Sequence, residues 1–421
     1  MAGNKMLERT ELGDNKDLRS EIKPGHEFQV TIENLSNDGS GIARHAGFVL
    51  FVPYTIPGEC AKVRVTKVHR NYAEAELLAI THPSEDRTQP VCSYFQRCGG
   101  CQYQHLRYEA QLYYKRNQVV ELLERLGGIQ KASEKVAATI PSPAIYGYRN
   151  KITPHFNRSK RQAADAPPAL GFLKRGSRHE IVDIESCAIA TDAVNAGLAE
   201  LRQQFLKNWR DYRRGATLLI RESDEGVVTD SRRTVSQTVC GIRLQFPAGD
   251  FFQNNRSILN SFVEYVVQEA KGADYLVDAY CGSGLFALCG AKYFKQVFGV
   301  EISPQAVERA RENARINGIS HVEFRLGDAA SLFRALEIDG ANAAMIIDPP
   351  RRGCDEAFLA QAIAFSARRV VYVSCYPPTQ IRDMRSFLEN GYELVRITPF
   401  DLFPQTKHVE TVMTLDRKKT E

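Results

Sequence analysis

The stretch from Tyr275 to Glu301 constrains the fold of this chain more than any other. It reads as a short apolar strand, the turn Cys281-Gly-Ser-Gly284, an apolar helical segment and a second strand that ends in Glu301. Glycines in such a turn let the backbone approach a ligand closely, and an acid about 20 residues further on suits two ribose hydroxyls. The pattern predicts a βαβ unit that binds a nucleoside cofactor, either a nicotinamide dinucleotide or S-adenosylmethionine.

Strands and helices alternate after this unit. We expect strands at 322–326, 344–347 and 369–374, helices at 304–317 and 378–390, and a terminal hairpin from strands at 394–399 and 409–416. This order is typical of an α/β doubly wound sheet, in which ligands bind at the carboxyl ends of the strands. The residues at those ends are Asp278, Tyr280, Glu301, Asp328, Asp348 and Cys375. Glu301 would accept the ribose hydroxyls, and Asp328 would accept the adenine amino group.

The length of 421 residues predicts several domains. Residues 1–21 are charged and lack periodicity, so we expect a flexible leader without a secretory signal. No apolar run approaches the roughly 18 residues that span a bilayer. We therefore expect a cytoplasmic monomer with no membrane partner. In that compartment ten cysteines predict free thiols, metal ligands or a nucleophile, and not disulfides.

Residues 22–82 read as five short strands, which predict a small OB-like β-barrel. Over Cys60–Val68, apolar residues alternate with basic ones. A basic stripe that binds RNA phosphates would consist of Lys62, Arg64, Lys67, His69 and Arg70. The alternative is an ordinary solvated strand face.

Three cysteines, Cys92, Cys98 and Cys101, share one short loop in which Gly99 and Gly100 allow the chain to wrap a compact centre. Such clustering predicts zinc or an iron–sulfur cluster, with Cys187 as the best fourth ligand. The spacing does not choose between the two metals.

Residues 83–248 form a predicted central α+β domain that carries this loop. A helix at 105–127, which we expect to pack on the catalytic domain, is followed by strands and a helix at 194–209. Basic residues interleaved with aromatic ones are typical of a surface for single-stranded RNA, although an ordinary solvated surface is the alternative. The basic residues are Arg149, Lys151, Arg158, Lys160, Arg161, Lys174, Arg175 and Arg178.

Residues 249–421 resemble the catalytic domain of the RNA uracil-5-methyltransferases. The matching motifs are Phe252-Gln-Asn, Asp278-Ala-Tyr-Cys-Gly-Ser-Gly, Gly299-Val-Glu, Asp348-Pro-Pro-Arg, Val373-Ser-Cys and Asp401-Leu-Phe-Pro-Gln-Thr-Lys-His-Val-Glu410. The barrel resembles the TRAM module through Gly39-Ser-Gly-Ile-Ala43 and Phe51-Val-Pro-Tyr-Thr-Ile-Pro-Gly58. One departure is Tyr376, which follows Cys375 where the family commonly has Asn.

The resemblance implies a class I methyltransferase fold and a role for each matching residue. Cys375 would be the nucleophile and Glu410 the base, while Gln253, Tyr280, Glu301 and Asp348 would bind S-adenosylmethionine. Cys92, Cys98, Cys101 and Cys187 would hold a [4Fe–4S] cluster. The expected activity is methylation of carbon 5 of a uridine in RNA.

The resemblance favours 23S rRNA as the substrate, with the T-loop uridine of tRNA as the alternative. From a different class, a non-catalytic RNA-binding iron–sulfur protein is the rival. A nicotinamide-dependent oxidoreductase would leave the Asp-Pro-Pro-Arg turn, the Cys375 and Glu410 pair and the barrel without a role.

Overall fold

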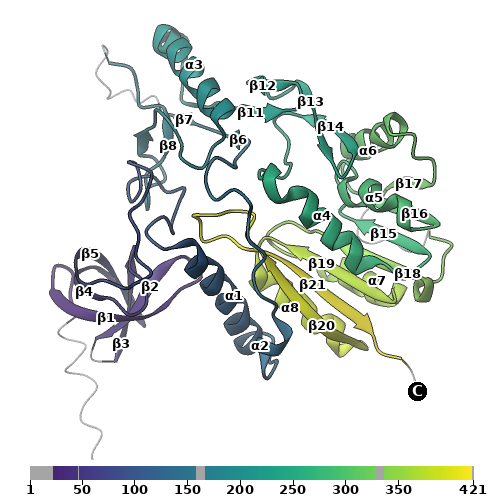
Figure 1. Cartoon of the computed structure of the whole chain (residues 1–421), viewed down its shortest axis with the longest axis horizontal. Coiled ribbons are helices and arrows are strands. Elements are labelled where there is room, and N and C mark those ends of the chain that lie inside the picture. The colour runs from purple at the N-terminus through teal and green to yellow at the C-terminus, as the bar shows by residue number, and fades with distance from the viewer. Residues whose placement is uncertain (1–21, 46, 158–165, 328–335, 420–421) are drawn as a thin grey trace, which may run out of the picture. The chain divides into compact units, whose positions relative to one another are not determined.

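The structure is a computed structural model of the chain, and it describes residues 22–45, 47–157, 166–327 and 336–419. The predicted leader at 1–21 and the predicted adenine ligand Asp328 lie outside these ranges. The chain divides into two compact units (Figure 1). The first consists of residues up to Gln89 together with His105–Arg107, and the second of Pro90–Gln104 and Tyr108–Glu421.

The first unit contains the predicted five-stranded barrel. Its strands are β1 (Glu27–Leu35), β2 (Ser40–His45), β3 (Phe48–Pro53), β4 (Cys60–Val68) and β5 (Tyr72–His82), closed in the order β1-β2-β3-β5-β4. The alternation in β4 sets its orientation, because Ala61, Val63 and Val65 are fully buried inside the barrel. Closure also removes the exposed edges of a small sheet.

The second unit is built on a seven-stranded sheet. Its strands are β15 (Tyr275–Ala279), β16 (Gln296–Glu301), β17 (Val322–Leu326), β18 (Ala343–Ile347), β19 (Arg369–Ser374), β20 (Tyr392–Phe400) and β21 (Glu410–Arg417). Their order in the sheet is β17-β16-β15-β18-β19-β21-β20, in which β21 runs antiparallel to both neighbours (Figure 1). The predicted doubly wound sheet with a terminal hairpin is confirmed.

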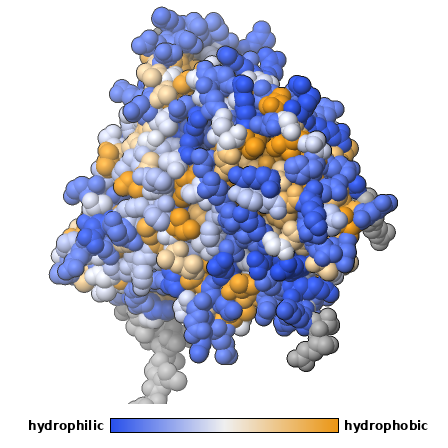
Figure 2. All heavy atoms as spheres, turned by 45° about the vertical axis from the view of Figure 1, so that its right-hand side comes forward, coloured by the Kyte–Doolittle hydropathy of each residue, from blue (hydrophilic) through white to orange (hydrophobic). Residues whose placement is uncertain are grey.

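Helices cover both faces of this sheet, and the alternation of side chains along each strand separates two core layers. Leu276 packs in one layer with α4 (Arg256–Ala270), α5 (Leu285–Gly290) and α6 (Pro304–Ile316). Val277 packs in the other with α1 (Tyr108–Arg125), α7 (Glu356–Phe365) and α8 (Pro377–Glu389). In Figure 2 the visible face is mostly hydrophilic with separate apolar patches, as expected when the apolar side chains fill two interior layers.

The remaining elements described in the second unit are short strands and two α-helices, of which α3 is long. They are α2 (Ala132–Lys135), α3 (Asp192–Asn208), β6 (Lys151–Ile152), β7 (His155–Phe156), β8 (Gly171–Leu173), β9 (Ile181–Asp183), β10 (Ala216–Thr217), β11 (Ile220–Ser223), β12 (Gly226–Val228), β13 (Thr234–Val239) and β14 (Ile242–Pro247). The helix expected at 105–127 is α1, and it packs against α8 and β20 as predicted. Most of the predicted central domain thus belongs to the same compact unit as the predicted catalytic domain, whereas residues 83–89 and 105–107 belong to the first unit.

Candidate functional site

The predicted site residues of neighbouring parallel strands meet at one edge of the sheet. Ala279 of β15 pairs with Ile347 of β18, so Tyr280 and Asp348, which follow them, leave adjacent strands at the same level. Glu301 ends β16, the other neighbour of β15. This edge includes the point where the strand order reverses between β15 and β18, which is where doubly wound sheets bind ligands.

Cys375 and Glu410 are brought together by the antiparallel pairing of β19 with β21. The last register pair of the two strands is Ser374 with Thr411, so the next residues outward are Cys375 and Glu410. Directly opposed residues of an antiparallel pair have Cα atoms about 4.5 to 5.5 Å apart. The two residues that the resemblance marks as nucleophile and base therefore face one another.

Electrostatics confirm that this group is compact. Burial, together with the charges of Glu410 and Asp348, raises the pKa of Cys375 to about 11 against the opposing effect of Arg351. Burial likewise raises the pKa of Glu410 well above its usual range, with Asp348 adding to the effect and Arg351 opposing it. Burial raises the pKa of Asp348 to about 7.

The thiol of Cys375 stands just before the N-terminus of α8, yet its pKa in the ligand-free protein lies above the ordinary value. Burial and the carboxyl groups of Glu410 and Asp348 disfavour the thiolate more than Arg351 favours it. The helix after Cys375 is predicted from the sequence, but the carboxyl group of Glu410 comes close to the sulfur only through the tertiary fold.

The glycine-rich turn and Glu301 are joined by backbone hydrogen bonds. The amide of Gly282 donates to Oε2 of Glu301 at 3.1 Å, and the amides of Ile302 and Ser303 donate to Oε1 at 2.9 Å. Tyr280 has a φ of +67° and Gly284 one of +93°, so the chain turns sharply after β15. Such strained backbone is common at ligand sites, because the fold holds it in place.

Asp278 lies under this turn and is fully buried. Its Oδ2 accepts the amide of Ala287 at 2.8 Å, while its Oδ1 is buried without a hydrogen-bond partner among the residues that the structure describes. Burial raises the pKa of this carboxyl well above its usual range, and Asp348 and Glu301 raise it further. A buried acceptor with no donor fits a cationic or N–H group of a ligand.

Gln253 lies in the loop between β14 and α4 and is buried. Its neighbour Phe252 stacks on Phe246 with ring centroids 4.2 Å apart, which fixes the loop. Contact of Gln253 with a cofactor stays a prediction.

The four cysteines of the predicted metal site lie close together. Burial raises the pKa of Cys101 to about 12, with further contributions from Cys187, Cys98 and Cys92. Cys187 and Cys92 also raise the pKa of Cys98. Within the described ranges, however, no group of three or more His, Cys, Asp or Glu side chains is placed so that it could hold a metal ion.

The predicted basic stripe of the barrel is largely neutralised by acids on adjacent strands. Glu27 forms ion pairs with Lys62 at 2.8 Å and with Arg64 at 2.7 Å, and Glu74 contacts His69 at 2.7 Å. The alternative of a solvated strand face therefore fits these three positions better.

The basic residues of the central region serve partly as structural donors. Nζ of Lys151 donates to the carbonyls of Gly249 and Asp250 at 2.8 and 3.0 Å, and Lys174 pairs with Glu180 at 2.6 Å. Arg158, Lys160 and Arg161 lie outside the described residues.

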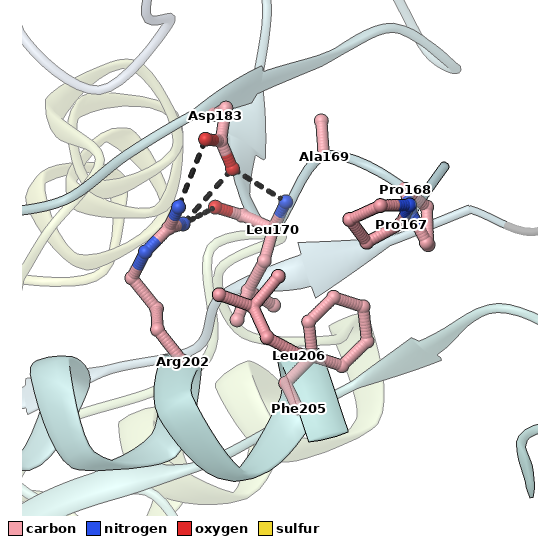
Figure 3. Close-up of a pocket in the computed structure, with 8 residues that line it drawn as sticks. All are labelled: Pro167, Pro168, Ala169, Leu170, Asp183, Arg202, Phe205 and Leu206. Atoms are coloured by element: carbon pink, nitrogen blue, oxygen red, sulfur yellow. Dashed lines mark hydrogen bonds and ion pairs between the residues drawn. The ribbon is translucent and has the colours of Figure 1, made fainter. Parts of the chain in front are cut away.

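A shallow pocket of about 280 Å³ lies elsewhere, between β9 and α3 (Figure 3). Arg202 crosses it to bind both carboxylate oxygens of Asp183 at 2.9 Å. None of the predicted site residues lines this pocket.

Sequence reasoning missed several side chains at or near the strand edge. Arg351 acts on Cys375, and Nη2 of Arg351 lies 3.4 Å from Nδ1 of His408. Both residues stood in motifs that matched the family, which was the available signal. Three large side chains are exposed at the ends of site elements: Phe251, Ile302 and Tyr376.

No helix in the described part of the chain is long and apolar enough to cross a bilayer.

Comparisons with known proteins agree with this geometry. Residues 228–418 match the family described as tRNA (Uracil-5-)-methyltransferase, and residues 22–78 match the TRAM domain. The crystal structure of Pyrococcus abyssi tRNA (uracil-54, C5)-methyltransferase, solved with S-adenosyl-L-homocysteine, has the same fold, with a TM-score of 0.72 at 24% identity. It covers 92% of this chain and 99% of that one.

Relatives match along most of their length. The tRNA (uracil(54)-C(5))-methyltransferase of Schizosaccharomyces pombe is 39% identical over 93% of this chain and 78% of its own. The enzyme of the same name from Saccharomyces cerevisiae is 34% identical over 92% and 73%. An uncharacterised RNA methyltransferase of Listeria innocua is 31% identical over 94% and 99%. With this identity, and with the sheet, the glycine-rich turn and the barrel in place, the chain belongs to the family of RNA uracil-5-methyltransferases.

Proposed function

We propose that Cys375 and Glu410 carry the methylation of carbon 5 of a uridine in RNA, with Cys375 as nucleophile and Glu410 as base. The observation that carries this assignment is the register of β19 and β21, which places the two residues opposite each other beside Asp348. A thiol and a carboxyl group at one point match the two steps that this reaction needs from the protein.

Carbon 5 of uracil is a weak nucleophile, so the ring must first be activated. The thiolate of Cys375 adds to carbon 6, which makes carbon 5 an enolate carbon. When bound, S-adenosylmethionine supplies a methyl group on a positively charged sulfur. Carbon 5 would take that methyl group as the methyl–sulfur bond breaks and neutral S-adenosylhomocysteine leaves. Glu410 then takes the proton from carbon 5, and the electron pair of the broken C–H bond expels the thiolate from carbon 6.

The glycine-rich turn and its neighbours fit S-adenosylmethionine. Glu301 is oriented by three backbone amides and suits the ribose hydroxyls. Oδ1 of Asp278, which has no hydrogen-bond partner among the described residues, would accept from an N–H group of the amino-acid moiety of S-adenosylmethionine. Ile302, which is 71% exposed, follows Glu301 directly and would pack on the adenine ring. Tyr280, Gln253 and Asp328 complete the proposed set.

We infer that the substrate is a uridine of tRNA, the alternative to 23S rRNA in our sequence-based predictions. Two relatives of 39% and 34% identity are named as enzymes of uracil 54 of tRNA, and they support this choice. The uridine must leave its stack to reach Cys375. Exposed rings such as Phe251 and Tyr376 suit stacking on unpaired bases.

The four-cysteine group fits an iron–sulfur cluster by its donors, and we propose Cys92, Cys98, Cys101 and Cys187 as the ligands of a [4Fe–4S] cluster. The sulfurs lie close enough to raise one another's pKa. The amide of Gly100 donates to Sγ of Cys98 at 3.4 Å, an N–H···S contact that stabilises a thiolate. We expect the cluster to shape the central region and to take no part in methyl transfer.

Iron analysis after anaerobic purification tests the cluster. Because a [4Fe–4S] cluster contains four irons, we expect about four irons per chain and an absorbance in the visible range. Both should be lost in Cys98→Ser, which removes one of the proposed ligands. A colourless protein with stoichiometric zinc would contradict iron. A cytoplasmic location and a monomeric state stay predictions.

The substrate is tested by incubating the protein and S-adenosylmethionine with a tRNA transcript or with a 23S rRNA fragment. We expect 5-methyluridine at position 54 of the tRNA, as detected by mass spectrometry. Methylation of the 23S fragment alone would overturn the choice of tRNA. RNA binding without methylation of either substrate would favour the non-catalytic rival.

A further inference from the structure

We propose that His408 is a positioning residue that holds the guanidinium of Arg351 against the sulfur of Cys375. Nδ1 of His408 lies 3.4 Å from Nη2 of Arg351. Because a guanidinium group has only donors, Nδ1 must be the acceptor and carry no proton. This inference rests on the proposed role of Cys375.

Cys375 depends on a nearby positive charge. Its sulfur is half-buried beside two carboxyl groups, those of Glu410 and Asp348, and each disfavours the thiolate. Arg351 is the positive group that acts in the opposite direction. Its turn lies beside the helix that follows Cys375, because Oγ1 of Thr379 in the first turn of α8 donates to the carbonyl of Arg351 at 3.1 Å. If the guanidinium moved into solvent, the thiolate fraction would fall.

Arg351 itself has little to hold it. It is an exposed residue on the turn after β18, and its long side chain loses rotamer entropy when it is held in one place. The hydroxyl of Thr379 donates to the carbonyl of Arg351 at 3.1 Å, which fixes only the backbone. In the described part of the chain, the hydrogen-bond contact of the guanidinium is the one with Nδ1 of His408.

The surroundings of His408 keep its ring neutral. Burial, together with the charges of Arg351, Lys407, Lys115 and Arg149, lowers the pKa of His408 to about 4. A protonated ring would lose its acceptor and repel Arg351. The positively charged surroundings therefore preserve the contact across the physiological pH range.

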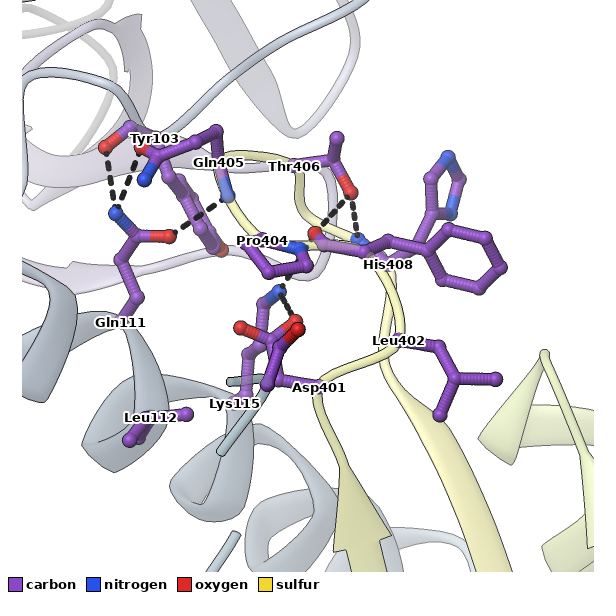
Figure 4. Close-up of polar contacts among 12 residues, drawn as sticks. Tyr103, Gln111, Leu112, Lys115, Asp401, Leu402, Pro404, Gln405, Thr406 and His408 are labelled. Carbon is purple, nitrogen blue, oxygen red and sulfur yellow. Dashed lines mark hydrogen bonds and ion pairs between the residues drawn. The ribbon is translucent and has the colours of Figure 1, made fainter. Parts of the chain in front are cut away.

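The backbone of His408 is held by the loop that contains it (Figure 4). Its amide donates to Oγ1 of Thr406 at 3.3 Å, and the ring of Phe403 lies 6.1 Å from its own at 77°. Nε2 of Gln111 on α1 donates to Oε1 of Gln405 at 3.0 Å. This loop therefore connects α1 with His408, whose ring contacts Arg351.

The test measures the thiolate directly, without RNA or S-adenosylmethionine. The alkylation rate of Cys375 by iodoacetamide is followed by peptide mass spectrometry between pH 7 and 11. His408→Phe keeps a ring but removes the acceptor, and we expect alkylation about tenfold slower at pH 8, equivalent to an upward shift of one pH unit. His408→Asn keeps an acceptor near the Nδ1 position, and we expect it to restore the rate to within about twofold.

Arg351→Gln should match His408→Phe, and the double variant should be no slower than either, because both remove the same contact. His408→Gln, which moves the acceptor one bond outward, replaces His408→Phe if that variant does not fold. The proposal is overturned if His408→Phe, or His408→Gln in its place, is alkylated at the wild-type rate across this pH range. It is also overturned if alkylation of His408→Asn is slowed as much as that of His408→Phe.

The outcomes also separate this inference from the proposed function. If the alkylation profile shifts in the His408 variant but the wild-type protein methylates no uridine, the positioning role of His408 stands and the proposed reaction is wrong. If the wild-type protein methylates the uridine but the alkylation profile does not shift in the His408 variant, only the positioning role is wrong.

Discussion

Lys115 on α1 and Asp401 at the end of β20 form an ion pair of 2.6 Å in which neither side chain is exposed to solvent (Figure 4). Nζ of Lys115 also donates to the carbonyl of Phe403 at 3.1 Å. Burial lowers the pKa of Lys115, and Asp401 opposes that effect. The pair ties α1 to the segment that leads to His408 and Glu410, so it connects the packing of the second unit with its proposed chemistry.

Replacing Lys115 by Met leaves the carboxylate of Asp401 buried without its partner. We expect a loss of about 3 to 5 kcal/mol in the free energy of unfolding, measured by urea denaturation. Lys295→Met is the matched control, because Lys295 pairs with Asp274 at 2.9 Å on the surface with its side chain 72% exposed. We expect the control to change stability by less than about 1 kcal/mol. Equal denaturation midpoints for the two variants would contradict a structural role for the buried pair.

Cys375→Ala removes the proposed nucleophile. We expect no detectable transfer of a tritiated methyl group to tRNA, while S-adenosylmethionine still binds, because the thiol acts only on the pyrimidine. Cys60→Ala, which removes a cysteine from β4 of the barrel, is the control and should keep full activity. Turnover by the Cys375 variant would exclude covalent catalysis by this residue.

Glu410→Gln removes the proposed base but leaves the thiol. Addition and methyl transfer can proceed, but loss of the carbon 5 proton is slowed by about 10² to 10⁴-fold. We expect a protein–RNA adduct to accumulate and to be visible as a retarded band on a denaturing gel. A variant that turns over at the normal rate without an adduct would assign the proton transfer to another group.

Asp348 should make cofactor binding depend on pH. Its pKa of about 7 in the free protein means that the carboxyl is largely protonated below neutrality. A cationic ligand favours the carboxylate and lowers that pKa, so binding releases a proton. Affinity should therefore rise between pH 5 and about 7 and level off above, since protonation no longer competes.

Titration calorimetry in buffers of different ionisation enthalpy measures this proton release. S-adenosylhomocysteine lacks the sulfonium charge, so its binding should release fewer protons. In Asp348→Asn the proton release that comes from this carboxyl group should be absent. Heats that do not depend on the buffer would show that Asp348 does not change its protonation when the cofactor binds.

Much of the fold follows from local patterns. Alternation in β4 predicts which residues fill the barrel, and the glycine-rich turn between two apolar strands predicts the first βαβ unit. The expected strands after Glu301 all lie close to their observed positions. Helix α7 was missed, because its segment Glu356–Phe365 is apolar on nearly every side and shows no helical periodicity.

The sequence by itself determined the family, the sheet class and the chemical types at the strand ends, since these depend on short motifs and on the period of apolar residues. Only the tertiary structure decided that Cys375 faces Glu410, because this needs β21 to insert antiparallel between β19 and β20. It likewise decided that the thiol is harder to ionise than the start of a helix suggests, and that Glu27 neutralises Lys62 and Arg64. Charge interactions depend on distance in space and on burial, and neither is written in the spacing of residues along the chain.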